Sequence, residues 1–372
     1  MPPHGDSQKT LAALGACCLF LATIEYMIPK PLPFLRLGLA NVPLLLALHL
    51  PFSFFGTLVA VKVLAQALIS GTLFSYVFLF SFAGTAASSL FMFLLARVFH
   101  GGGARRGAIS FVGISVAGAF LSNITQLVLA RFFILGESAL YIAPPFLFVG
   151  IISGFLLGLF TEKFTQQSVW YKSVTGAFMP CLHYENGAAM RRSPHSPPKK
   201  IRFTKEVMLF IIGAVLSITV LFIPWTSIRL ALFIMFWIIA AVRGRAGNPF
   251  ITLFVFSTIV LCNMLSPYGK VLFSIASFDI TEGALLGALK KAATIEGLLM
   301  LSKITMSDTL RLPGVIGNTI AESFRIVRIL NDKSTNRPSL TKGKGKAESA
   351  AGTALGGIIH WIDELLIRAE TL

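Results

Sequence analysis

Residues 108–132 read AISFVGISVAGAFLSNITQLVLARF, and this stretch decides what kind of fold the chain can have. A helix needs about twenty predominantly apolar residues to cross roughly 30 Å of hydrocarbon. The stretch meets that requirement, so it predicts a membrane-spanning helix. It also holds two amides, Asn123 and Gln126, and polar side chains inside lipid usually face a cavity or another helix. We therefore expect this span to carry part of a polar site.

The composition of the whole chain also indicates a protein that is surrounded by lipid. Its 372 residues are 55% hydrophobic and 13% charged, with a mean hydropathy of +0.77. Such a chain has too little polar surface to cover a soluble globule of this size. The formal net charge of +16 is assigned to Lys- and Arg-rich cytoplasmic loops rather than to nucleic-acid binding. We expect an integral, multi-pass protein of the bacterial cytoplasmic (inner) membrane, with no nucleic-acid partner.

Stretches of the same kind recur and predict the architecture. In the N-terminal part they lie at 10–28, 35–50, 52–70, 72–97, 108–132 and 141–161. In the C-terminal part they lie at 206–223, 226–242 and 249–266, followed by a less apolar helical pattern at 282–304. The sequence therefore predicts an all-α polytopic membrane protein. A six-helix bundle is expected first, followed by a second bundle of three or four transmembrane helices.

Composition also divides the chain into domains. Residues 166–205 are rich in Ser, Pro and basic residues, which is typical of a linker. They separate a membrane domain at 1–165 from a second one at 206–372. The linker and the basic segments HGGGARRG (100–107) and RGRAG (243–247) all fall inside if the N-terminus is cytoplasmic, as the positive-inside rule requires. We expect both termini in the cytoplasm.

Two amphipathic segments follow the last apolar run. Residues 308–331 and 350–369 each carry a helix-period apolar stripe beside charged residues. Such helices are too polar to span a bilayer and too amphipathic to be free coil, so they should lie on a membrane surface or on a partner. The sequence leaves open whether they dock onto a partner or only anchor at the interface.

The sequence shows no metal, nucleotide or disulfide motif. Its cysteines, Cys17, Cys18, Cys181 and Cys262, have no paired spacing and no histidine at metal-ligand spacing. Each Gly-Lys pair lacks the other residues of a phosphate-binding loop. We expect no metal site, no catalytic residue and no cofactor bound by this chain. ATP, if it drives the protein, must be used by partner subunits.

Polar side chains from several predicted spans fall at one depth. With a cytoplasmic N-terminus, the first, third and fifth spans run outward and the second runs inward, which places these side chains in the outer half of the membrane. Lys62 lies four residues before one glutamine, and Asn123 three residues before another, so each pair shares a helix face. We predict one outward substrate-binding pocket, lined by Glu25, Arg36, Asn41, Lys62, Gln66, Asn123, Gln126 and Arg131.

The charges of this predicted pocket indicate a ligand class. Three cations, Arg36, Lys62 and Arg131, stand against a single glutamate, which makes the set net positive. An anionic or phosphate-bearing solute would suit such a site. The amides have an alternative role, because Asn and Gln also bond one membrane helix to another.

Residues 36–43, RLGLANVP, interrupt the second span. Gly38 and Pro43 both break regular helix, and irregular backbone at membrane depth is tolerated where it lines a cavity. We predict that this stretch forms a wall of the pocket.

The first span carries a different signal. Ala12 and Ala16, with Gly15 between them, form a face of small residues. Small residues let two membrane helices approach closely, so we predict helix docking at this face.

Three pieces of the N-terminal part resemble one family of membrane proteins. They are PLPFLRLGLANVPLLLAL, VKVLAQALISGTLFSYVFLFSFAGTAASS and GISVAGAFLSNITQLVLARF, in matching order within residues 10–162. Together they resemble the Gx transporter family, also described as heptaprenyl diphosphate synthase component I. That family looks like the substrate-binding S components of energy-coupling factor (ECF) transporters. The resemblance implies six helices, a pocket that opens outward, docking through Ala12 and Ala16, and a basic residue, commonly Arg, where Lys62 stands.

The C-terminal half more loosely resembles the transmembrane T component of the same transporters, through the stretch EGALLGALKKAATIEGLLMLSKIT and the helices after it. This resemblance implies ECF-type ATPase subunits as partners, coupled through 308–331 and 350–369. The chain departs from the family there. Its coupling helices typically end in Ala-Arg-Gly triplets, whereas this sequence reads FRIVRILNDKS and LLIRAETL.

The leading hypothesis is a membrane component of an ECF-type transporter that imports a small anionic solute, either vitamin-like, flavin-like, or isoprenoid- or phosphate-bearing. Two alternatives stay open: an accessory or scaffold subunit of a flavin or quinone redox system, and a non-catalytic subunit of heptaprenyl diphosphate synthase. Catalysis is not expected, because polyprenyl chemistry needs clustered aspartates to hold magnesium against diphosphate. The five aspartates of this chain are never neighbours.

Overall fold

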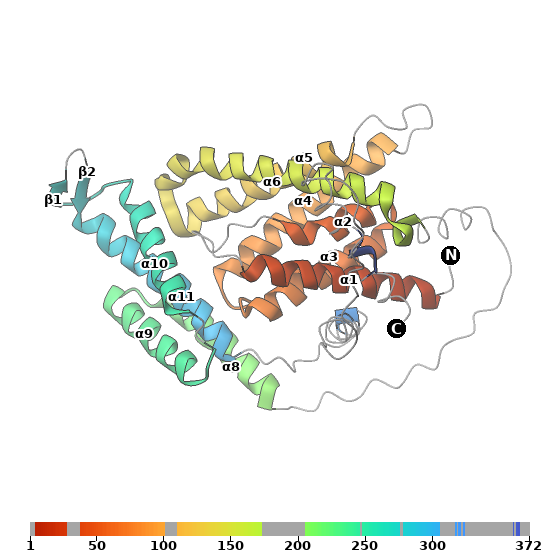
Figure 1. Ribbon diagram of the computed structural model, residues 1–372. Coiled ribbons are helices and arrows are strands. Elements are labelled where there is room, and N and C mark those ends of the chain that lie inside the picture. The colour runs from red at the N-terminus through yellow and green to blue at the C-terminus, as the bar shows by residue number, and fades with distance from the viewer. Residues whose placement is uncertain are drawn as a thin grey trace, which may run out of the picture.

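The computed structural model describes six stretches of the chain and a few positions near its end (Figure 1). The stretches are 4–27, 38–100, 110–172, 205–245, 248–275 and 278–305, and the positions are 317, 319, 320, 323, 360 and 362–364. Nearly all of these residues are helical, so the structure confirms a mostly helical protein.

The described N-terminal residues form five long helices and one broken segment. Where a single span was expected at 35–50, the described residues make only short helical turns. α5 packs along both α4 and α6, and α1 packs along α3 (Figure 1). The elements are α1 (His4–Met27), η1 (Leu39–Asn41), α2 (Val42–Leu46), η2 (Ala47–His49), α3 (Phe52–Ser70), α4 (Tyr76–His100), α5 (Phe111–Ala130), η3 (Arg131–Leu135), η4 (Gly136–Ser138) and α6 (Ala139–Gln167).

α6 lies close against α5 because glycines recur once per turn on the face that meets α5. A Cβ added at Gly158 would lie 2.5 Å from the Cα of Val112, and one at Gly154 would lie 2.8 Å from the Cβ of Ala119. Real Cβ atoms do not approach other carbons this closely, so only glycine lets the two backbones come together. This packing holds the polar side chains of α5 in a defined orientation.

α11 is the central helix of the C-terminal part and packs along α8, α9 and α10. The two lysines that interrupt the pattern at 282–304 do not break it, and Lys291 Nζ donates to Asn263 Oδ1 of α10 at 2.9 Å. The elements are α8 (Lys205–Phe222), α9 (Thr226–Val242), α10 (Pro249–Met264), β1 (Val271–Ile275), β2 (Phe278–Thr281) and α11 (Glu282–Thr305).

A short hairpin corrects the all-α expectation. β1 and β2 pair antiparallel, with Val271 opposite Thr281 and Ile275 opposite Phe278. Both strands are rich in β-branched and aromatic residues, which is the usual strand signal, and they lie between two of the predicted spans.

The N-terminal and C-terminal parts share an apolar core. Phe80 and Ile134 from the N-terminal part pack in one cluster with Ile259 and Ile295 from α10 and α11. Polar contacts also cross the boundary: the Ser138 and Ser266 hydroxyl oxygens lie 3.0 Å apart, and the backbone N–H of Phe74 donates to Ser302 Oγ at 3.2 Å. The two parts are therefore packed against each other.

Two stretches are long and apolar enough to cross a membrane by length and composition, Tyr76–Phe99 and Phe111–Gln167. The other apolar helices of the described residues are shorter. Large apolar side chains point outward from several helices, among them Phe148 and Leu156 of α6 and Phe250 of α10. Such a surface suits lipid better than water.

Candidate functional site

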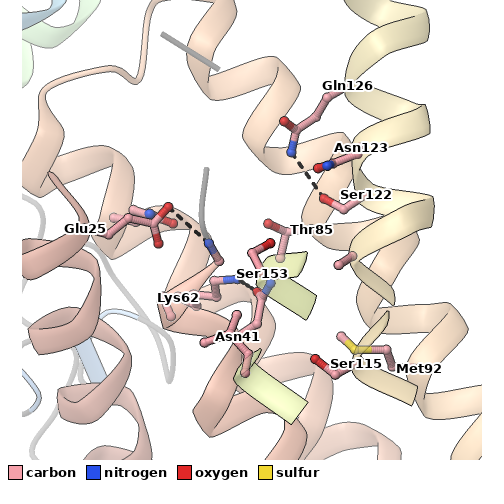
Figure 2. A pocket seen from close by; sticks show the side chains of 15 residues that line it. Glu25, Asn41, Lys62, Thr85, Met92, Ser115, Ser122, Asn123, Gln126 and Ser153 are labelled. Carbon is pink, nitrogen blue, oxygen red and sulfur yellow. Dashed lines mark hydrogen bonds between the residues drawn. The ribbon is translucent and has the colours of Figure 1, made fainter. Parts of the chain in front are cut away.

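A small cavity lies between α1, the broken segment and α3 on one side and α4, α5 and α6 on the other (Figure 2). We call it the polar cavity, because carboxylate, ammonium, amide and hydroxyl groups line it. Six of the eight residues predicted to line one pocket do line it: Glu25, Asn41, Lys62, Gln66, Asn123 and Gln126. Polar groups from separate helices thus meet in one cavity. Their role in binding a solute stays a prediction.

Of the two arginines of the predicted set, the structure describes only Arg131. Arg131 does not line the cavity. It lies in the turn after α5, its side chain is 47% exposed, and its guanidinium pairs with Glu137 at 2.8 Å. The expectation that it faces the pocket is wrong. Arg36 lies outside the described residues.

Gly38, Ala40 and Asn41 of the stretch RLGLANVP line the cavity, and Glu25 binds this segment. The Glu25 carboxylate accepts hydrogen bonds from the backbone N–H groups of Gly38 at 3.3 Å and Leu39 at 3.0 Å. These are N–H groups at the start of a short helical turn, where no intrahelical partner exists for them. In the same wall, Lys62 Nζ donates to Asn41 Oδ1. The broken segment is therefore held to α1 by the Glu25 carboxylate and to α3 by the Lys62 ammonium.

Gly38→Ala should destabilise the protein by about 1–2 kcal/mol, because an alanine would have to adopt a left-handed backbone conformation. Gly38 has φ +80°, and an added Cβ would lie 2.9 Å from the amide nitrogen of Asn41. Chemical denaturation of the detergent-solubilised protein measures the effect. Gly56→Ala is the matched control, because a Cβ there meets nothing within 4 Å and alanine favours helix over glycine. An equal loss in both variants would contradict the assigned strain.

The opposite wall is uncharged. Asn123 Nδ2 donates to the carbonyl of Phe146 at 3.2 Å, and Gln126 Nε2 donates to Ser122 Oγ at 3.2 Å. Gly150 makes room for Asn123, since a Cβ there would lie 1.8 Å from its amide nitrogen. Sequence reasoning missed the hydroxyls of this wall, because Ser and Thr are common in membrane helices and carry little signal. They are Thr85, Ser115, Ser122 and Ser153.

The cavity is small in this conformation. The centre of a water-sized sphere can occupy about 40 Å³ of it. A single water needs about 10–15 Å³ by this measure, so the space suits a few waters or a fragment of a solute. A vitamin-sized solute requires the walls to move apart. The charged side chains that line it, Glu25 and Lys62, have opposite signs, so the described lining is not net positive as expected.

The cavity residues all fall inside a stretch with a known family model. Residues 14–164 match the family model described as heptaprenyl diphosphate synthase component I. We call this matched stretch the component I domain. Residues 205–308, which lie outside this component I domain, match a domain of unknown function (DUF8519). No curated protein and no solved structure matches the chain. The likeness of the C-terminal half to a T component therefore stays a prediction.

The small-residue face of α1 is in contact with the C-terminal tail. Ser323 is fully buried, and its Oγ donates to the carbonyl of Ala12 at 3.2 Å. A Cβ at Gly15 would lie 2.5 Å from that same hydroxyl oxygen. Ile320, three residues earlier in the sequence, packs with Leu19 of α1. The predicted docking face of the component I domain is thus occupied by the first predicted tail segment.

The side chains of Ala12 and Ala16 are both buried in the apolar core that α1 forms with α2 and α3. They therefore support the N-terminal part from within.

The second predicted tail segment contacts residues 168–170, just after the component I domain. The Asp363 carboxylate accepts hydrogen bonds from Ser168 Oγ and from the backbone N–H groups of Val169 and Trp170, the latter two at 3.1 Å. Ile362 packs in the core that also holds Ala12 and Trp170. Apart from these positions, the segments 308–331 and 350–369 lie mostly outside the described residues.

No group of three or more His, Cys, Asp or Glu side chains that could hold a metal occurs in the described part of the chain.

Proposed function

We propose that this chain is the membrane component of an ECF-type transporter, in which the component I domain binds a small polar solute and separate ATPase subunits supply the energy. The observation that carries the proposal is the polar cavity. A carboxylate, an ammonium and several amides, contributed by separate helices, meet between otherwise apolar helices. Ionisable groups in such helices are costly and usually serve a pathway or a ligand.

Burial argues against a purely structural role for these groups. Glu25 and Lys62 are 1% and 4% exposed. Where buried charges only hold a fold together, replacing them by apolar side chains is often neutral or stabilising, so a charged lining is weak evidence for stability and better evidence for function. The cavity wall built by RLGLANVP adds backbone groups that regular helix would not offer.

The contact between α1 and Ser323 supports the transport cycle that we propose. In that cycle, motion of ATPase subunits reaches the C-terminal part, and its tail segments transmit the motion to the small-residue face of α1. The component I domain then reorients as a rigid body and moves the solute across. The C-terminal part acts as a T component in this proposal, and the whole assembly lies in the bacterial inner membrane with both termini inside.

Partner identification tests the proposal. The full chain, tagged and purified from native membranes, should bring down ATP-binding subunits, and an unrelated tagged membrane protein from the same membranes should not. The description of the matched family names a prenyl diphosphate synthase. Recovery of the catalytic subunit of such an enzyme would overturn the proposal. Flavin or quinone redox proteins in place of ATPases would also overturn it, and would favour a scaffold role.

A further inference from the structure

We propose that the polar cavity selects a solute with no net charge, which donates hydrogen bonds to the side-chain amides of Gln66 and Gln126. This inference rests on the proposed function and names the class of its substrate. It differs from the anionic solute that the sequence suggests, because the structure changes which charges face the cavity.

The charges of the described lining are balanced and engaged by the protein. Glu25 supplies one negative charge and Lys62 one positive charge, and Arg131 has turned away to pair with Glu137. The Glu25 carboxylate accepts two backbone N–H groups, and the Lys62 ammonium donates to Asn41. A charged solute would have to lose its hydration and draw one of these groups away from its protein partner. Moving a charge out of water without a free counter-charge is strongly unfavourable.

Two amides of the lining, by contrast, offer oxygens without a partner. Gln66 is 8% exposed and Gln126 is 4% exposed, and both line the cavity. Neither Oε1 atom has a hydrogen-bond partner among the residues that the structure describes. A buried acceptor without a donor costs free energy, so such groups usually meet a water or a ligand. These two oxygens therefore require donors from the contents of the cavity.

The class of solute does not depend on how each amide is oriented. Rotation of the Gln126 amide would exchange its oxygen for its NH₂ group and let the Ser122 hydroxyl donate in return. The cavity would then require an acceptor in place of a donor, and neither requirement involves charge. The hydroxyls of Thr85, Ser115 and Ser153 add further neutral partners. A molecule with amide, hydroxyl or amine groups and no net charge matches this lining.

Three small probes of different charge test the class directly. Acetamide is neutral, acetate is an anion and methylammonium is a cation, and each is small enough for the space observed. We would measure saturation-transfer NMR from the purified full chain to each probe. The test variant combines Gln66→Leu with Gln126→Leu. The matched control combines Gln166→Leu with Gln167→Leu, the same change on exposed glutamines at the end of α6.

Acetamide should show transfer that falls about tenfold in the test variant and is unchanged in the control, because each lost neutral hydrogen bond weakens binding by a factor of a few. Circular dichroism verifies that both variants are folded. Glutamine-dependent transfer to acetate or methylammonium, but not to acetamide, would overturn the neutral class and leave the transporter proposal intact. If transfer to none of the three probes depends on these glutamines, the proposal is overturned, and the two amides only bond one helix to another. Failure of the proposed function appears separately, as the absence of ATP-binding partners.

Discussion

Lys62→Met should weaken solute binding about 100-fold, which corresponds to roughly 2.7 kcal/mol of binding free energy, so that solute is no longer retained through purification. Methionine keeps most of the side-chain volume but removes the ammonium that binds Asn41. The described lining then keeps the Glu25 carboxylate and loses the Lys62 ammonium. The shape of the cavity and the electric field inside it therefore both change. Mass spectrometry of small molecules released from the purified full chain measures the retained amount per protein. Retention at the wild-type level would remove Lys62 from the site.

Stability must be separated from binding in this experiment. Lys62 is 4% exposed, and removing one member of a buried charged set typically costs about 3–5 kcal/mol of unfolding free energy. Combining Lys62→Met with Glu25→Gln removes both charges and should restore much of that stability without restoring retention. Lys163→Met, on an exposed position of α6, is the matched control and should change neither quantity. Recovery of retention in the double variant would show that the ammonium acts only through the fold.

Gly15→Val should detach the C-terminal tail from the component I domain and stop solute uptake while the cavity still binds solute. The Cβ position at Gly15 lies 2.5 Å from Ser323 Oγ and 3.3 Å from a methyl group of Val61, so a branched side chain cannot fit while the tail is docked. Overpacking of this kind costs about 1–3 kcal/mol, which undocking relieves. Hydrogen exchange should rise in peptides that contain Ile320 and Ser323, and uptake into native cells should fall to background.

Gly56→Val is the control for this substitution. Gly56 also lies within a helix, and a Cβ there meets nothing within 4 Å. In the Gly56→Val variant, hydrogen exchange in the tail and uptake of solute should both match the wild type. Normal uptake in Gly15→Val, despite a detached tail, would refute the coupling role of this contact. Replacing Ala12 and Ala16 with leucine is a less specific test, because Ala16 lies in the core of the component I domain.

Much of the architecture follows from the sequence because the membrane restricts the choices. Apolar runs at 108–132 and 226–242 coincide with α5 and α9 to within a few residues. The depth of each costly polar residue follows from its distance along a span, which is why Glu25, Lys62 and Asn123 could be expected to meet. The face of small residues on α1 could also be recognised in the sequence. Close approach through small residues is a main way for helices to associate in lipid.

Other features depend on contacts that sequence spacing does not specify. Arg131 directly follows α5, but the chain leaves α5 through an irregular turn that brings Glu137 within reach of its guanidinium. The hairpin at 271–281 forms between two spans whose ends it joins, and the tail residue that occupies the α1 face lies more than three hundred positions away in sequence. Periodicity cannot predict such pairings.

By itself, the sequence determined that the chain is helical and apolar, where its helices run and which polar groups share a depth. Only the tertiary structure decided which of those groups face one another, that the charges of the described lining balance, and that the space between them holds little more than a few waters. The physical reason is that hydropathy specifies position along a helix axis, whereas rotation about that axis is set by close packing. Here the glycines of α6 set the rotation of α5, because they let α5 approach until Asn123 fits against Gly150.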